Sequence, residues 1–203
     1  MRTGTAAYAT GQETARRILE ASRRVLVEEG SRNLTMRRVA REIGISPGNL
    51  NYYYPSRAEL MEDLLQHVID GYLHQFDVLR NQAGEDTEQQ FRAVVSFVFD
   101  DLSRRDTTLF FPELWVLANR DERVAQQMER LYAQYREILV DLIEQMNPGL
   151  SETRRGDLAL LISASIEGHT VFVGHDRPHR ARAGELRELA IESFLQIVKR
   201  TRD

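Results

Sequence analysis

Apolar residues recur every three or four positions along most of the chain, and this spacing predicts amphipathic α-helices. The spacing is clearest over residues 13–29, 56–80, 87–102, 121–146, 151–172 and 184–201. No segment sustains the alternation of apolar and polar residues that a half-buried strand requires. The pattern therefore predicts an all-α protein of about nine helices, with Pro112 starting or kinking a helix in the less regular stretch 103–120.

Residues 35–57 read as two short helices joined by a tight turn. Thr35 is an N-cap residue before the first apolar stripe, and Gly44 can adopt the left-handed conformation that ends a helix. Ser46 is a second N-cap, followed by Pro47 at the first helical position, where its missing N–H costs nothing. Two short helices and a Gly-containing turn predict a helix-turn-helix motif, whose second helix enters the DNA major groove.

The second short helix carries polar and aromatic residues and no carboxylate. Asparagine can read adenine through two hydrogen bonds, and hydroxyl groups reach phosphate oxygens. The predicted base-facing set is Ser46, Pro47, Gly48, Asn49, Asn51, Tyr52 and Tyr53, and the predicted phosphate contacts are Thr35, Arg37, Arg38 and Arg57. A plain helical hairpin is the alternative, but it explains neither the paired caps nor the absence of acidic residues.

The segment ISPGNLNYYYPSRAEL, residues 45–60, resembles the end of the DNA-binding domain of the tetracycline-repressor (TetR) family of bacterial transcription regulators. By position, Ile45, Leu50 and Tyr54 match core residues of that family, and Ser46 to Asn49, Tyr52 and Tyr53 match DNA-facing ones. Thr35 matches a phosphate-contacting helix start, and Arg57 stands where the family usually has Lys. Asn51 departs from the usual Tyr, so the phosphate contact made there is not carried over.

The resemblance implies a DNA-binding domain over residues 12–57 and a ligand-binding and dimerisation body over residues 58–203. It also implies a homodimer that acts as a repressor and leaves a palindromic operator on double-stranded DNA when a small-molecule effector, of unknown identity, binds the body. The helices near 152–174 and 184–201 are expected to join the dimer. Ser163, Ala164 and Gly168 are small enough for close helix approach, and Phe194, Ile197 and Val198 supply apolar surface.

Charge is distributed unevenly along the chain. Residues 1–57 hold ten arginines and five glutamates, a net charge of +5, whereas residues 58–203 hold 17 basic and 26 acidic residues, a net charge of −9. A basic segment that coincides with a helix-turn-helix pattern favours nucleic acid as its partner. Cysteine is absent, no apolar run reaches the length of a membrane span, and the first residues lack a secretion signal, so a cytoplasmic protein without membrane contact is expected.

The body offers weaker signals for a ligand site. Its crowded aromatic residues are either core residues or the lining of a small-molecule cavity, and the resemblance favours a cavity. The predicted ligand-binding residues are Phe111, Trp115, Tyr132, Tyr135, His169 and Phe172.

Other chemistry finds little support in the sequence. His169, His175 and His179 do not have metal-ligand spacing on one helix face, and nucleotide-binding and hydrolase motifs are missing, so neither a metal, a cofactor nor an enzyme is expected. The alternative to a DNA-binding regulator is an all-α small-molecule-binding or scaffolding protein.

Overall fold

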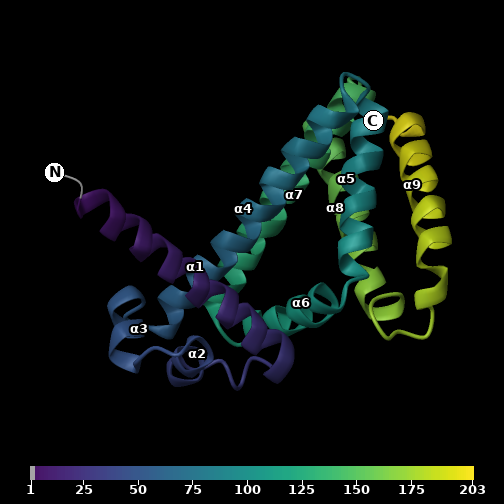
Figure 1. Cartoon of the computed structure of the whole chain (residues 1–203). Coiled ribbons are helices and arrows are strands. Elements are labelled where there is room, and N and C mark those ends of the chain that lie inside the picture. The colour runs from purple at the N-terminus through teal and green to yellow at the C-terminus, as the bar shows by residue number, and fades with distance from the viewer. Residues whose placement is uncertain (1–2) are drawn as a thin grey trace. The chain divides into compact units, whose positions relative to one another are not determined.

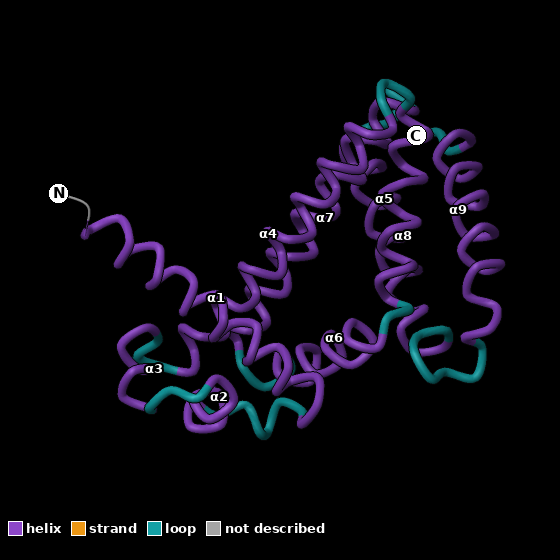
Figure 2. Tube along the Cα trace, in the orientation of Figure 1, coloured by secondary structure: helices purple, strands orange, loops and turns teal. Residues whose placement is uncertain are grey.

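The computed structural model describes the backbone of residues 3–203 and the side chains from residue 11 onward. This part of the chain contains nine α-helices, one short 3₁₀ helix (residues 180–182) and no strand. Figures 1 and 2 draw these helices and the loops that join them. The all-α prediction is therefore confirmed. The helices are α1 (Thr3–Glu29), α2 (Met36–Ile43), α3 (Pro47–Tyr53), α4 (Arg57–Ala83), α5 (Thr87–Leu102), α6 (Arg105–Ala118), α7 (Glu122–Met146), α8 (Glu152–Phe172) and α9 (Ala183–Arg200).

The chain forms two compact units, and three helices are continuous from one unit into the other. The first unit comprises the residues up to Ile69 together with Leu109–Glu129, and the second comprises Asp70–Thr108 and Arg130–Asp203. The boundaries fall inside α4, α6 and α7. These three helices therefore connect the two units through unbroken backbone.

In the first unit, α2 packs against both α1 and α3. Leu26, Val39 and Leu50, one from each helix, are fully or almost fully shielded from solvent. The predicted apolar faces of these helices therefore meet in one core. Helix α1 begins at Thr3, ten residues before the predicted start at residue 13.

Four helix ends follow the predicted capping residues. The hydroxyl groups of Thr35, Ser46 and Ser151 accept hydrogen bonds from backbone N–H groups three residues later. Gly44 adopts the left-handed conformation, at φ 71° and ψ 31°, and ends α2. Thr87 and Gln90 have the spacing of a capping box, and this spacing predicts Thr87 as the N-cap of α5; the structure corrects that prediction, because Asp86 is the N-cap and its carboxylate accepts the Gln89 N–H at 3.1 Å.

The second unit is built around a core to which α4, α5, α7, α8 and α9 all contribute. Its buried residues include Phe76, Phe91, Leu139, Ile162 and Phe194. Helix α5 packs against both α8 and α9. No described helix combines the length and the apolar character that crossing a membrane requires.

Pro112 lies in the middle of α6, so it does not start that helix. The glycine at position 174 is required by a close approach: a Cβ atom there would lie 2.8 Å from both the Thr108 hydroxyl oxygen and the Thr170 carbonyl oxygen. The loop after α8 is tied down at this point, because the Thr108 hydroxyl accepts the His175 backbone N–H at 2.9 Å.

Candidate functional site

The turn between α2 and α3 presents the predicted base-facing residues to solvent. Leu50 and Tyr54 are buried, as predicted for core positions, whereas Tyr52 is 83% exposed. The Tyr52 and Tyr53 rings pack edge to face, with their centroids 5.4 Å apart. The residues that share this exposed face are Ser46, Pro47, Gly48, Asn49, Asn51 and Tyr52, with Tyr53 partly buried beside them. None of these residues is acidic, so the exposed face of α3 carries no carboxylate of its own.

Two of the predicted phosphate contacts are already engaged inside the protein. Arg38 forms ion pairs with Glu29 at 2.5 Å and with Glu42 at 2.8 Å. Arg57 donates hydrogen bonds to the backbone carbonyl oxygens of Leu34, at 2.9 Å, and Ser31, at 3.3 Å. In this structure both side chains therefore stabilise the first unit.

Arg37 and Arg41 have the opposite environment. Both are exposed, and neither forms an ion pair or a side-chain hydrogen bond among the described residues. They lie four residues apart on α2, so they share one face of that helix. Arg37 was predicted as a phosphate contact; Arg41 was not, although its spacing from Arg37 was a readable signal.

Other arginines of α1 are also held by the protein. Arg16 pairs with Glu13 and Glu20, and Arg24 pairs with Glu42 at 3.4 Å. The Arg23 guanidinium lies 5.4 Å from the centre of the Phe110 ring, where the ring face attracts the cation. The loop after α1 is fixed in a similar way, because the Ser31 N–H donates to Glu113 at 2.7 Å.

The predicted ligand-binding residues are divided between the two units. Phe111 and Trp115 belong to the first unit, and Tyr132, Tyr135, His169 and Phe172 to the second. Phe172 is 62% exposed on α8. The His169 ring meets Phe99 edge to face at 4.4 Å, and its Nδ1 lies 3.1 Å from the Ser165 carbonyl oxygen.

Glu167, which the sequence interpretation missed, lies beside the predicted tyrosines. Burial raises the pKa of its carboxyl group to about 7, and a hydrogen bond from Tyr132 offsets part of that rise. The pKa of Tyr135 is raised as well, first by burial and then by the negative charge of Glu167. A carboxylate directly after the apolar Ile166 and three residues before Thr170 was the signal available in the sequence.

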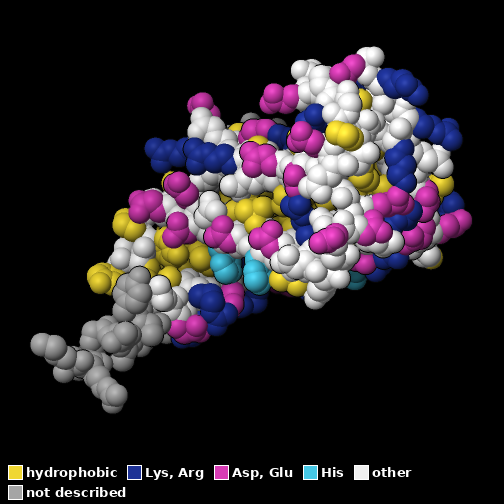
Figure 3. Space-filling view, turned by 90° about the horizontal axis from the view of Figure 1, so that it is seen from above, with side chains coloured by type: hydrophobic (Ala, Val, Ile, Leu, Met, Phe, Trp, Pro, Cys, Tyr) yellow, Lys and Arg dark blue, Asp and Glu magenta, His cyan; other side chains and the backbone are white. Residues whose placement is uncertain are grey.

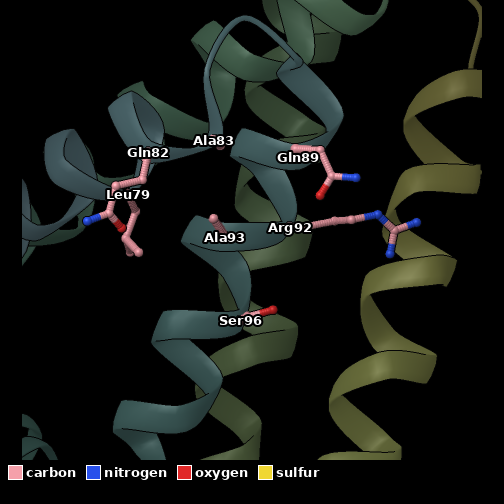
Figure 4. Close-up of a pocket in the computed structure, with 7 residues that line it drawn as sticks. All are labelled: Leu79, Gln82, Ala83, Gln89, Arg92, Ala93 and Ser96. Carbon is pink, nitrogen blue, oxygen red and sulfur yellow. The ribbon is translucent and has the colours of Figure 1, made fainter.

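The surface of the second unit carries an open pocket of about 460 Å³ at the end of α4 and the start of α5 (Figure 4). Arg92, one of its lining residues, extends toward α9, where it pairs with Glu192 at 2.8 Å; it also pairs with Glu88 at 3.1 Å. Lys199 contacts Glu88 too. The charge of Arg92 is therefore already paired with carboxylates of the protein, so the pocket offers no unpaired cation to a ligand.

Exposed apolar residues gather on α8 and α9. They are Leu160, Leu161, Val171 and Phe172 on α8, and Leu189 and Ile197 on α9. Phe194 and Val198, predicted as apolar surface, instead lie in the core of the second unit, and Ser163 is buried as well.

On the face that Figure 3 displays, acidic and basic side chains are intermixed and leave hydrophobic side chains visible between them. No group of three or more histidine, aspartate or glutamate side chains suited to a metal ion occurs among the described residues.

Comparison with known proteins identifies the two parts of the chain. Residues 18–64 match the family model of bacterial regulatory proteins of the tetR family, and residues 87–196 match that of the C-terminal domain of BetI-type transcriptional repressors. An uncharacterised HTH-type transcriptional regulator from the dhlA 5′ region of Xanthobacter autotrophicus is 29% identical over 167 residues, which cover 76% of this chain and 77% of that protein.

Solved structures share the fold at low sequence identity. Salmonella enterica GusR superposes with a TM-score of 0.73 at 18% identity, covering 92% of this chain and 96% of that one. A transcriptional regulator from Saccharomonospora viridis in complex with choline superposes with a TM-score of 0.69 at 18% identity, covering 94% and 97%. The C-terminal family model alone spans more than half of the 203 residues, and both models describe regulators rather than enzymes. The chain therefore belongs to the TetR family of DNA-binding transcriptional regulators.

Proposed function

We propose that this regulator is a homodimeric repressor that binds a palindromic operator through α3 and leaves it when a small molecule binds the helical body. The observation that supports operator recognition best is the exposed, acid-free face of α3, which is held by a capped turn and a buried Leu50. We further propose that residues 12–57 carry the DNA-binding function and residues 58–203 the effector and dimer functions. The protein would act in the cytoplasm, where its DNA target lies.

Operator binding is tested with the promoter region next to the chain's own gene, since regulators of this family commonly act on adjacent genes. Affinity should fall log-linearly with salt concentration, because bound phosphates release counterions. Replacing Asn49 by Ala should relax the base preference while leaving the salt dependence unchanged. Salt-independent binding, or no binding to any fragment of that region, would count against the proposal.

A second copy of this chain is the proposed partner of the exposed face on α8 and α9. Leu161, Phe172 and Leu189 are each at least half exposed, and a monomer gains nothing from apolar side chains kept in water. The α3 helix has only seven residues and can read few base pairs, whereas a two-fold dimer reads two half-sites a whole number of helical turns apart. Both arguments support a dimer, and the first favours α8 and α9 as its interface.

The dimer is tested by sedimentation of full-length variants at micromolar concentration. Phe172→Glu and Leu189→Glu should shift the protein to monomer and weaken operator binding. Val116→Glu is a matched control, because Val116 is also about half exposed but lies on α6. Phe194→Glu is unsuitable, because Phe194 is a core residue and its loss would unfold the second unit. A monomeric double variant that still binds the palindrome as tightly as the parent would refute the dimer proposal.

Release by an effector is supported by the fold and by the continuity of three helices between the units. The Saccharomonospora viridis regulator of the same fold was solved in complex with choline, so this architecture accommodates a small molecule. Ligand binding in one unit can alter DNA binding only if the ligand prefers one arrangement of the protein over another. Helix α4 directly follows the recognition helix and continues into the second unit, so it is the natural lever.

A further inference from the structure

Three oxygen atoms on the facing sides of α7 and α8 are shielded from solvent and have no hydrogen-bond partner in the protein. They are Oε2 of Glu167, the hydroxyl oxygen of Thr170 and the phenol oxygen of Tyr135. Buried polar atoms in folded proteins are almost always hydrogen-bonded, so three unsatisfied oxygens in one region require an explanation.

The three side chains belong to one cluster. Tyr132 donates a hydrogen bond to the Glu167 carboxylate, which brings α7 and α8 together at this point. Tyr135 lies three residues further along α7, and the negative charge of Glu167 contributes to the rise of its pKa. Thr170 lies three residues after Glu167 on α8, and residues at this spacing are neighbours on one helix face. We name Tyr132, Tyr135, Glu167 and Thr170 the buried polar cluster.

A carboxylate in this environment is costly to ionise. Transfer of a charge out of water is strongly unfavourable unless a partner of opposite charge or several hydrogen bonds replace the hydration shell. Tyr132 supplies one hydrogen bond, and the cluster supplies no cation. The site is therefore complementary to a ligand that brings both a positive charge and hydrogen-bond donors.

Aromatic rings adjoin the cluster. Tyr135 stacks on Phe76 with a centroid distance of 5.6 Å, and Phe76 meets Phe97 edge to face at 5.8 Å. The ring centroids of Tyr72 and Phe97 are 6.0 Å apart. The Tyr72 hydroxyl donates its proton to Asp101, so it does not donate to the unsatisfied oxygens of the cluster. Ring faces attract cations and pack against apolar groups, which suits a charged head on a hydrocarbon stem.

We propose that the effector of this regulator is a protonated primary amine whose ammonium group binds Glu167, Tyr135 and Thr170. This proposal rests on effector control as proposed above and names the chemical class. An ammonium group has three donors and no acceptor, and the cluster offers three unsatisfied oxygens that can accept. A quaternary ammonium ion has no N–H and would leave all three unsatisfied, whereas an anion would be repelled by Glu167.

Matched pairs of amine and alcohol test the charge and the donors together. Isothermal titration calorimetry with the full chain at pH 8 compares n-butylamine with 1-butanol, and benzylamine with benzyl alcohol. The members of each pair are similar in size and differ in charge. Each amine should bind more tightly than its alcohol by about tenfold or more, because hydrogen bonds to charged groups are the strong ones.

Glu167→Gln should remove that preference, because the amide keeps the side-chain size and an acceptor for Tyr132 but has no charge. Tyr135→Phe and Thr170→Val should each weaken amine binding while leaving the alcohol unaffected. Glu137→Gln is the control: Glu137 is an exposed carboxylate on α7, and its replacement changes the net charge by the same amount. Thermal unfolding of every variant verifies that it is folded.

Equal affinity for amine and alcohol, or amine binding that survives Glu167→Gln, would overturn the proposal. Equal affinity for tetramethylammonium and n-butylamine would overturn the assignment to primary amines. The proposed function is judged separately by operator release. An amine that binds through Glu167 without releasing operator would contradict effector control, whereas release by a neutral compound that ignores Glu167 would contradict only the ligand class.

Discussion

The helix-turn-helix and the buried polar cluster use polar side chains in opposite ways. In the first, the polar residues either cap a helix, as Thr35 and Ser46 do, or face solvent, as Asn49 does. In the second, Oε2 of Glu167 and the phenol oxygen of Tyr135 are shielded from solvent and have no hydrogen-bond partner in the protein. Exposed polar groups are hydrogen-bonded to water, so they do not lower the free energy of unfolding. Buried polar groups without a hydrogen-bond partner do lower it. The polar groups of the helix-turn-helix are therefore satisfied by water before DNA binds, whereas three oxygen atoms of the buried polar cluster are unsatisfied in the free protein.

The largest expected effect separates the buried and exposed residues of α3. Leu50→Ala should lower the free energy of unfolding by about 2–5 kcal/mol, because it opens a cavity where the side chain is fully buried. Operator binding should be lost with it. Tyr52→Ala, two residues away and 83% exposed, should weaken DNA binding without changing the urea midpoint. If Tyr52→Ala unfolded the unit as strongly as Leu50→Ala, α3 would have no free face.

The next effect concerns the stability cost of Glu167. The folded protein holds the carboxyl proton up to a pKa of about 7, whereas the unfolded chain releases it near the ordinary value of 4.5. The folded state therefore binds more protons within this range, and the contribution of this group to stability is lost as pH rises through 7. Glutamine cannot ionise, so Glu167→Gln avoids this loss of stability. At pH 8 the free energy of unfolding of the variant should exceed that of the parent by roughly 1–3 kcal/mol.

Urea unfolding at a series of pH values checks this sign. The two proteins should have similar stability near pH 4.5 and diverge until about pH 8, with the variant the more stable. Glu137→Gln, at an exposed position on α7, should follow the parent at every pH. A Glu167→Gln variant that is less stable than the parent at pH 8 would mean that contacts within the protein already offset the cost of burying the ionised carboxylate.

Local rules explain why the sequence predicted the helix-turn-helix so well. Thr35, Gly44 and Ser46 act on backbone groups within a few residues, so spacing alone reveals them. Arg38 and Glu29 are nine residues apart and meet only after α1 and α2 have packed. Sequence spacing contains no information on such pairs, and for this reason Arg38 and Arg57 were predicted to contact phosphate although the structure engages both within the first unit.

The burial of residues in the body was harder to predict from the sequence for a similar reason. Phe194 and Ile197 follow the same helical period, and only the packing of α5 against α9 buries the first and exposes the second. Glu167 was overlooked because a single carboxylate on a helix is usually solvated. The burial of its Oε2 atom and its hydrogen bond from Tyr132 both depend on the approach of α7, which no local pattern encodes.

A smaller effect distinguishes free arginines from engaged ones. Arg37→Ala and Arg41→Ala should leave stability unchanged and lower the slope of log affinity against log salt by about two units in a dimer, one phosphate for each subunit. Arg38→Ala and Arg57→Ala should instead lower the unfolding midpoint, since they remove contacts within the first unit. Binding titrations between low and moderate salt, together with urea unfolding, measure both quantities. A large slope change in Arg38→Ala with unchanged stability would show that its ion pairs exchange for phosphate.

The smallest expected effect is a change in tryptophan emission when an effector binds. Trp115 is the chain's single tryptophan, so its signal needs no label. It lies on α6 in the first unit, and the same helix begins in the second. A conformational change that a ligand causes in the second unit can be transmitted to Trp115 along this continuous helix. An amine that releases operator should therefore shift Trp115 emission over the same concentration range. Linkage requires that operator DNA weaken amine binding by the factor by which the amine weakens operator binding. Release of operator with unchanged emission, at concentrations where calorimetry shows the site filled, would exclude α6 as the route and leave α4 and α7 as the helices that carry the signal.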